Sequence, residues 1–168
     1  MPCSRYRPRA RRDCQVSVVS YQVSRSLIPA LRVNNKKQVL HELAGKAAEL
    51  CGLSERNILE ILQQREKLGS TGVGNGIAIP HGKLPKLTRL FGLFARLERP
   101  VDFEALDGQP VDLVFLLLAP EGAGADHLKA LARVARLLRD ADVARKLRES
   151  RDAEAIYAVL AMPPASAA

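Results

Sequence analysis

The sequence predicts an α/β domain in which helices cover both faces of one sheet. Amphipathic helical patterns occupy both ends of the chain, and short apolar runs typical of buried strands lie between them. The 168 residues are 47% hydrophobic and 26% charged, a balance that excludes a wholly disordered chain and a disulfide-stapled miniprotein. No apolar run reaches the roughly 18 residues that span a bilayer. An integral membrane protein is therefore excluded, and no internal repeat is present.

The net charge of +8 is concentrated at the start of the chain. Residues 1–25 hold six arginines and one acid, whereas the remainder is nearly balanced. This distribution weakens the case for nucleic-acid binding that a basic pI would otherwise favour. We predict a disordered basic extension over residues 1–25, one domain over residues 26–161 and a disordered tail over residues 162–168.

The three cysteines, Cys3, Cys14 and Cys51, match neither the spacing of a zinc site nor that of a redox CxxC pair. The arginine-rich start also lacks the apolar stretch of a secretory signal. We therefore expect reduced thiols and a cytoplasmic protein, and we predict no metal and no other cofactor.

Two helices are predicted in the first half of the domain, after a short extended segment. Asn35 can cap the first helix, with Gln38 in the position that a capping box prefers, and apolar residues recur at helical spacing up to Gly52. Ser54 can cap the second helix, and Gly69 follows its end. The inward-facing residues of this second helix are predicted to be Ile58, Ile61, Leu62 and Leu68.

The middle of the chain predicts strands separated by turn sequences. Residues 70–76 (STGVGNG) predict a tight loop, followed by a short strand over residues 77–79. Pro80 is expected to end that strand because proline lacks an N–H. Longer strands are predicted over residues 90–97 and 113–118, the second buried on both faces. An Asp-Gly turn between these two strands indicates that they are neighbours.

Three further helices are predicted after the strands. Asp126 is expected to cap the first, the second covers residues 142–149, and Asp152 begins the last. The first of these helices is expected to bury Leu128, Leu131, Ala132, Ala135 and Leu138. Its exposed side is expected to carry Lys129, Arg133, Arg136 and Arg139.

His81 is the histidine best placed for chemistry. Pro80 restricts the chain on one side of it, Gly82 leaves room on the other, and a glycine-rich loop precedes it. Positions beside a rigid sheet commonly carry function. The same features would suit a hydrogen-bonding turn histidine, and spacing alone leaves both interpretations open. His41 is expected to be an ordinary surface residue, and His127 lies near the start of a helix.

Several common site motifs are missing. The glycine-rich loop fails the Walker A pattern, because Ile77 and Leu84 stand where Gly and Ser or Thr are needed, and it also fails the dinucleotide pattern GxGxxG. A Gly-x-Ser-x-Gly elbow is missing as well. His81 and His127 have no third ligand placed beside them in the sequence. ATP, NAD and metal chemistry are therefore disfavoured.

Phosphoryl transfer suits the residues that are present. A neutral imidazole is a good nucleophile toward phosphorus, provided that cations or N–H donors hold the phosphoryl oxygens. Arg65 and Lys83 could supply charge, although either could be an ordinary solvated residue. The start of the helix that carries His127 could supply N–H groups and a positive dipole end, which should also lower the pKa of His127.

The segment REKLGSTGVGNGIAIPHGKL (residues 65–84) resembles the active-site signature of the mannitol/fructose-type, or type 2, enzyme IIA of the phosphoenolpyruvate-dependent phosphotransferase system. The constrained places of that signature are filled by Glu66, Val73, Gly74, Ile77, Ala78, Ile79, Pro80, His81 and Gly82. The likeness is closest to the nitrogen-regulatory IIA branch and extends over about residues 27–160.

This resemblance implies a three-layer α/β/α domain around a small mixed sheet. It also implies that an HPr-type phosphocarrier phosphorylates His81 on Nε2, with Arg65 and His127 supporting the phosphoryl group. Lys83 and Gly82 are further candidates for phosphate support. The protein would then be a phosphoryl-transfer component rather than an independent turnover enzyme. Its phosphorylation state would regulate partners such as sensor kinases or potassium-transport components.

Two other functions stay open from the sequence. A sugar-specific, fructose- or mannitol-type IIA that passes phosphate to a IIB component would keep the same site and differ only in its partner. A pure protein-binding module, or a nucleic-acid binder acting through the arginine-rich start, is the third hypothesis. Among the clustered arginines of residues 5–12, Tyr6 is the only interleaved aromatic residue. We therefore expect neither nucleic acid among the partners nor direct insertion into a membrane.

Overall fold

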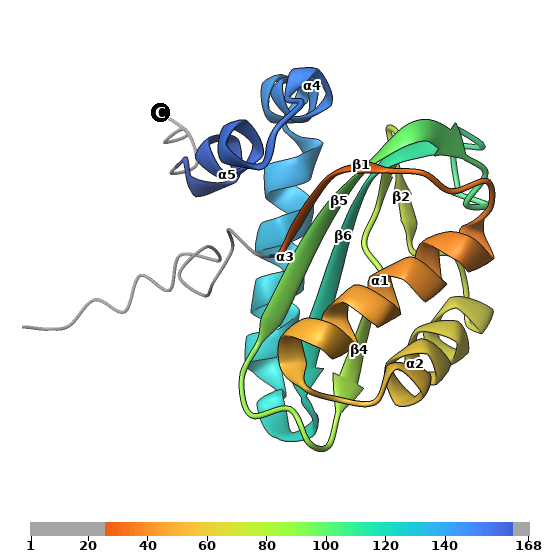
Figure 1. Cartoon of the computed structure of the whole chain (residues 1–168), viewed down its shortest axis with the longest axis vertical. Coiled ribbons are helices and arrows are strands. Elements are labelled where there is room, and N and C mark those ends of the chain that lie inside the picture. Colours follow the sequence, from red (N-terminus) through yellow and green to blue (C-terminus); the bar gives the residue numbers. More distant parts are fainter. Residues whose placement is uncertain (1–25, 163–168) are drawn as a thin grey trace, which may run out of the picture.

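A mixed six-stranded sheet lies between two layers of helices in the computed structural model, which describes residues 26–162 (Figure 1). The strands are β1 (Leu27–Leu31), β2 (Gly72–Gly74), β3 (Ile77–Ala78), β4 (His81–Leu84), β5 (Phe91–Val101) and β6 (Val111–Pro120). The helices are α1 (Lys36–Cys51), α2 (Glu55–Lys67), the short 3₁₀ helix η2 (Glu121–Ala123), α3 (Ala125–Arg139), α4 (Ala141–Glu149) and α5 (Ala153–Ala161). The predicted three-layer α/β/α fold around a mixed sheet is confirmed.

The strand order is β1-β5-β6-β3-β2, with β4 also paired to β6. β5 and β6 are antiparallel neighbours, as the Asp-Gly turn predicted, and β1 lies parallel to β5. β3 and β4 run one after the other along the same side of β6, both parallel to it. Pro80 separates them, yet its carbonyl still accepts a hydrogen bond from the backbone N–H of Leu117, with N and O 3.0 Å apart. The chain therefore continues along the sheet beyond the proline.

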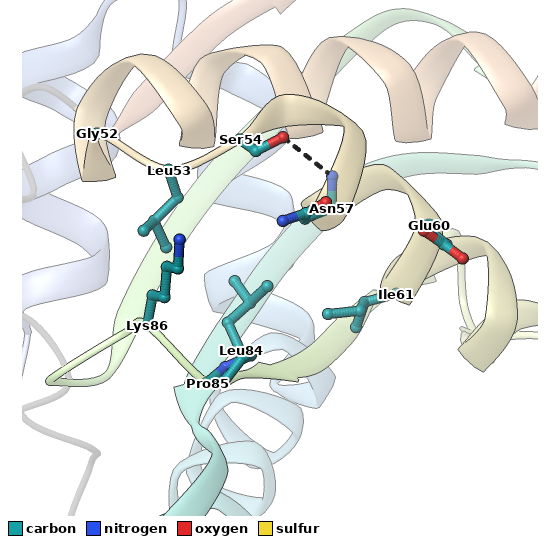
Figure 2. Close-up of a pocket in the computed structure, with 9 residues that line it drawn as sticks. All are labelled: Gly52, Leu53, Ser54, Asn57, Glu60, Ile61, Leu84, Pro85 and Lys86. Atoms are coloured by element: carbon teal, nitrogen blue, oxygen red, sulfur yellow. Dashed lines mark hydrogen bonds between the residues drawn. The ribbon is translucent and has the colours of Figure 1, made fainter.

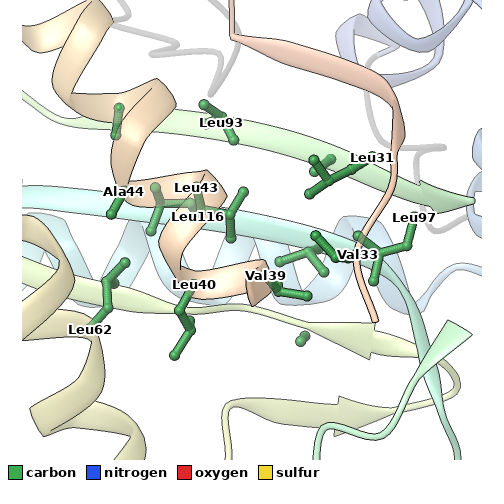
Figure 3. Packing of buried hydrophobic residues seen from close by; sticks show 14 of the residues in the cluster. Leu31, Val33, Val39, Leu40, Leu43, Ala44, Leu62, Leu93, Leu97 and Leu116 are labelled. Atoms are coloured by element: carbon green, nitrogen blue, oxygen red, sulfur yellow. The ribbon is translucent and has the colours of Figure 1, made fainter. Parts of the chain in front are cut away.

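Each face of the sheet carries its own apolar core. On one face, Leu40 and Leu43 of α1 pack with Leu93 of β5 and Leu116 of β6 (Figure 3). On the other face, Phe94 of β5 packs among residues of α3, α4 and α5. Alternate residues of a strand point to opposite faces, so β5 contributes to both cores. β6 is buried almost throughout, as predicted for a strand covered on both sides.

The helix ends follow the predicted capping residues in most places. Asn35 accepts a hydrogen bond from the N–H of Gln38, with N and O 2.9 Å apart, and Gly52 ends α1 with a left-handed φ of 67°. Ser54 and Asp152 cap α2 and α5 in the same way. Local hydrogen bonds between neighbours in the sequence therefore set these boundaries.

Two predictions about α3 were wrong. Asp126 does not cap this helix, which begins at Ala125 after η2 and after Gly124, whose φ is 47°. Leu128 is 65% exposed, and Ala132 is exposed as well. The residues that α3 buries are His127, Ala130, Val134 and Leu138. Apolar residues occur on several sides of α3, and the contact with the sheet decides which side is inward.

Other boundaries also differ from the predictions. Residues 72–74, expected to be loop, form β2 and pair with β3, and β4 follows Pro80 where no strand was expected. Leu68 is 85% exposed, because α2 ends at Lys67 and the chain turns away. None of the helices in residues 26–162 is both long enough and apolar enough to cross a membrane. The predictions for residues 1–25 and for the tail after Met162 lie outside the described part of the chain.

Candidate active site

His81 begins β4 and presents a half-buried ring whose two nitrogens have different partners. Nδ1 lies 2.9 Å from the carbonyl oxygen of Ile79, so Nδ1 carries the proton and donates it. Nε2 lies 3.1 Å from Nε of Arg65, whose N–H it accepts. These contacts assign the neutral tautomer in which Nε2 holds the lone pair. The nitrogen that can attack phosphorus is therefore Nε2.

Arg65 reaches His81 from the last turn of α2. A second hydrogen bond, from Nη1 to the carbonyl oxygen of Gly69 at 3.0 Å, orients its guanidinium group. The planar guanidinium keeps its charge at all relevant pH values and has several N–H donors. Arg65 can thus lie against Nε2 in the free protein and donate to phosphoryl oxygens once phosphate is attached.

His127 lies beside His81 and comes from the first turn of α3. The ring centroids of the two histidines are 5.7 Å apart, and the rings are tilted by 46°. His127 is 5% exposed, and its Nδ1 is buried with no hydrogen-bond partner. Buried polar atoms are rarely left unpaired, and those that are commonly mark places where a ligand or water binds. The structure thus brings His81, Arg65 and His127 together at one site.

The surroundings of both histidines favour the neutral form. Burial is the main cause that lowers the pKa of His81; the hydrogen bond to the Ile79 carbonyl opposes it, the positive charge of Arg65 lowers the pKa further, and Glu66 has a smaller raising effect. Burial also lowers the pKa of His127, and the nearby titratable His81 and the charge of Lys83 lower it further. A neutral imidazole at neutral pH is the form that a nucleophile requires.

Lys83 and Gly82 occupy opposite faces of β4. Lys83 comes two residues after His81 and therefore lies on the same face of the strand. It is exposed, and its positive charge lowers the pKa of His127. Gly82 faces α2, where an added Cβ would lie only 2.4 Å from Cγ2 of Ile61. The close packing of α2 on β4 therefore requires glycine here, whereas phosphate support by either residue remains a prediction.

Three residues to which the sequence assigned no role lie behind this site. These residues are Glu66, Thr71 and Lys36, and Glu66 contacts the other two. The sequence could have pointed to Glu66, because it fills a constrained place of the signature. Lys36 comes from the start of α1, 45 positions before His81 in the chain, and nothing in the sequence pointed to it. Residues 26–162 contain no cluster of three or more His, Cys, Asp or Glu side chains that could hold a metal ion.

A separate cavity of about 300 Å³ lies between α2 and the end of β4 (Figure 2). Apolar side chains of Leu53, Ile61 and Leu84 face it, with Ser54 and Lys86 at its edges. None of the three site residues lines this cavity. It is therefore distinct from the surroundings of His81.

Comparison with known proteins matches this chain to a family. The family model described as "Phosphoenolpyruvate-dependent sugar phosphotransferase system, EIIA 2" matches residues 23–162. A nitrogen regulatory protein of Bradyrhizobium diazoefficiens is 75% identical over 143 residues, which cover 85% of this chain and 94% of the relative.

Two further matches represent a solved structure and a sugar-specific protein. The crystal structure of nitrogen regulatory protein IIA-Ntr from Neisseria meningitidis superposes with a TM-score of 0.77 at 37% identity, covering 82% of this chain and 94% of that one. The fructose-specific EIIABC component of Bacillus subtilis is 37% identical over 126 residues, which are 74% of this chain and 20% of the relative. The likeness therefore extends to both regulatory and sugar-specific proteins.

Proposed function

Because this chain belongs to the EIIA 2 family of the phosphoenolpyruvate-dependent sugar phosphotransferase system, and within it to the nitrogen-regulatory IIA proteins, we propose that it is a regulatory phosphocarrier. His81 accepts a phosphoryl group from an HPr-type phosphocarrier. The phosphorylated and unphosphorylated forms then bind partner proteins differently. Sensor kinases and potassium-transport components are the partner classes that we propose, and the cytoplasm is the proposed location.

The observation that carries this proposal is the pairing of Nδ1 with Ile79 and of Nε2 with Arg65. In the proposed step, the Nε2 lone pair of His81 forms a bond to the phosphorus of a donor phosphohistidine. The N–P bond of the donor breaks, and its electron pair returns to the donor imidazole. Arg65 moves its N–H groups from Nε2 to the phosphoryl oxygens, and the buried His127 ring lies within reach of the same group.

The test is phosphorylation by phosphoenolpyruvate, enzyme I and an HPr-type phosphocarrier, followed by measurement of acid-labile, base-stable phosphate. We expect the wild-type protein to be labelled and His81→Ala to stay unlabelled. His41→Ala is the matched control, because His41 is exposed on α1, and it should be labelled like the wild type. Label retained by His81→Ala would overturn the assignment.

A sugar-specific IIA is the second candidate, and the likeness to a fructose-specific EIIABC component favours it. Such a protein would pass its phosphate to a IIB component. The phosphorylated protein should therefore be offered to purified fructose- and mannitol-type IIB proteins. Rapid loss of phosphate to IIB would favour sugar uptake. Phosphate retention, with state-dependent binding to a purified sensor kinase or potassium-transport component, would favour the regulator.

A further inference from the structure

The Glu66 side chain is the central acceptor of a buried hydrogen-bond network behind His81. Its side chain is 7% exposed. Oε1 accepts from the backbone N–H of Thr71 at 3.0 Å and lies 2.9 Å from Nζ of Lys36, and Oε2 accepts from Oγ1 of Thr71 at 2.6 Å. A buried carboxylate is costly unless it is paired and hydrogen-bonded. These contacts therefore confine it to one position.

From Thr71 the network continues to the ring of His81. The Thr71 carbonyl accepts from the backbone N–H of Ile79 at 2.9 Å, and the Ile79 carbonyl accepts from Nδ1 of His81 at 2.9 Å. The hydrogen bond to Thr71 thus fixes the backbone of Ile79, and the Ile79 carbonyl in turn accepts from His81. A displacement of Thr71 would therefore move the acceptor that keeps the proton on Nδ1.

Glu66 is also linked to the other ring nitrogen, because it follows Arg65 in the last turn of α2. The backbone carbonyl of Glu66 accepts from the N–H of Gly69 at 3.2 Å, and the Gly69 carbonyl accepts from Arg65. The side chain of Glu66 closes the same turn at Thr71. One residue thus anchors the turn that holds the guanidinium against Nε2.

Lys36 supplies the counter-charge from the first turn of α1. Its Nζ also lies 3.2 Å from Oε2 of Glu104 and 5.3 Å from the ring centroid of Phe103. Burial lowers the pKa of Lys36, but its hydrogen bonds to the carboxylates of Glu66 and Glu104, together with their negative charges, outweigh burial and leave that pKa raised. Glu104 is 77% exposed and contacts the same lysine, so it provides a matched control for Glu66.

We propose that Glu66 is a positioning residue for phosphorylation of His81, an inference that rests on the proposed function. Held by Lys36 and bonded to Thr71, it keeps the Ile79 carbonyl opposite Nδ1 and Arg65 opposite Nε2. The ring then stays in the tautomer whose Nε2 lone pair can attack phosphorus. Glu66 acts through Thr71 and Arg65 rather than on the reacting atoms.

The test compares Glu66→Ala and Glu66→Gln with Glu104→Gln in single-turnover phosphorylation. Glutamine keeps the size of glutamate but removes the charge opposite Lys36 and places an NH₂ group beside Thr71. A misplacement of about 1 Å can cost up to about 100-fold in rate, so Glu66→Ala should slow phosphorylation by that order. Glu66→Gln should have a smaller effect, and Glu104→Gln should leave the rate unchanged.

The second readout is the ¹⁵N spectrum of labelled histidine, which distinguishes a protonated from an unprotonated ring nitrogen without any phosphate donor. In the wild type, His81 should show one tautomer with unprotonated Nε2, and Glu66→Ala should show a mixture. If Glu66→Ala does not fold, the rate and the tautomer of Glu66→Gln test the proposal. An unchanged tautomer and rate in a folded variant would overturn the positioning role, even if stability falls. If the wild-type protein accepts no phosphate, the proposed function fails, and the tautomer spectrum alone decides the role of Glu66.

Discussion

A neutral histidine can carry its proton on either ring nitrogen, and only the nitrogen without the proton can attack phosphorus. In His81 the Ile79 carbonyl holds the proton on Nδ1, and Arg65 donates to Nε2. Two hydrogen bonds therefore set which nitrogen holds the lone pair and which cation lies beside it. Each of these residue-level contacts has a measurable consequence.

Arg65→Ala should slow phosphorylation of His81 by about 10²–10³, the usual cost of losing one oriented donor at a developing charge. The fold should survive, because Arg65 is half-buried at the end of α2. Single-turnover labelling measures the rate, and far-UV circular dichroism checks the fold. Arg56→Ala, an exposed arginine at the opposite end of α2, should behave as wild type. Equal rates for both variants would contradict the role of Arg65.

The lowered pKa values of His81 and His127 predict an acid-sensitive fold. In the unfolded chain both residues titrate near the ordinary value of 6.5, whereas in the folded chain they take up protons only at lower pH. Between those pKa values the unfolded state binds more protons, so the free energy of unfolding falls as pH falls through 6.5. It levels off below the folded-state pKa. Urea unfolding across this range measures the slope.

Replacing both histidines isolates their contribution to that slope. The double variant His81→Gln/His127→Gln should show a weaker loss of stability on acidification than the wild type. His41→Gln is the control, and its slope should match the wild type because His41 is exposed on α1. An unchanged slope in the double variant would argue against the lowered pKa values.

At the scale of elements, the site depends on how closely α2 and α3 approach β4. α2 brings Arg65 to His81 from one face, and α3 brings His127 from the other. The close approach of α2 to β4 depends on the glycine that follows His81. The packing of each helix on the sheet can be tested separately.

Gly82→Ala should destabilise the domain by about 1–3 kcal/mol, the usual cost of overpacking. The added Cβ would lie 2.4 Å from Cγ2 of Ile61, so α2 would have to move away from β4. Gly122→Ala is the matched control, since an added Cβ there meets nothing within 4 Å. Urea unfolding compares the two. In an Ile61→Ala background, Gly82→Ala should cost much less, and an equal cost would show that the clash is not the cause.

Two leucines of α3 test which side of this helix faces the sheet. Leu138 is fully buried and Leu128 is 65% exposed. Leu138→Ala should cost about 2–5 kcal/mol, because it removes core contacts and leaves a cavity. Leu128→Ala should stay within about 0.5 kcal/mol of the wild type. Comparable losses of stability in chemical denaturation would contradict the observed orientation of α3.

At the scale of the whole molecule, the sheet is a rigid support between two cores. The central strands β5 and β6 are buried between α1 and α2 on one face and α3, α4 and α5 on the other. Close-packed interiors have low compressibility and do not deform continuously. A change of charge at His81 should therefore stay local.

Phosphorylation should change partner binding through charge and local contacts, with little change in the fold. A phosphoryl group adds roughly two negative charges, which Arg65, Lys83 and the start of α3 can accommodate. Backbone amide NMR of both forms should show shifts confined to residues 65–84 and 122–130. Widespread shifts over residues 90–97 and 113–118 would indicate a global switch instead.

The helix starts at Asn35, Ser54 and Asp152 could be predicted from the sequence, because each capping side chain bonds to a backbone N–H only three residues later. The continuously apolar run of β6 indicated a strand covered on both faces, and the residues around His81 made it the candidate histidine. These features depend on neighbours in the chain, so their physical causes can be recognised without coordinates.

The tertiary structure decided what depends on partners distant in sequence. β4 is a strand because His81 to Leu84 pair with Leu117 to Pro120, and no local preference of those residues required it. The side of α3 that is buried follows from its contact with the sheet, which turned Leu128 outward and His127 inward. Lys36 meets Glu66 only because α1 and α2 pack side by side on one face of the sheet. Hydrogen bonds and ion pairs between layers form between groups that the fold brings together. Such pairs cannot be predicted from the spacing of residues along the chain.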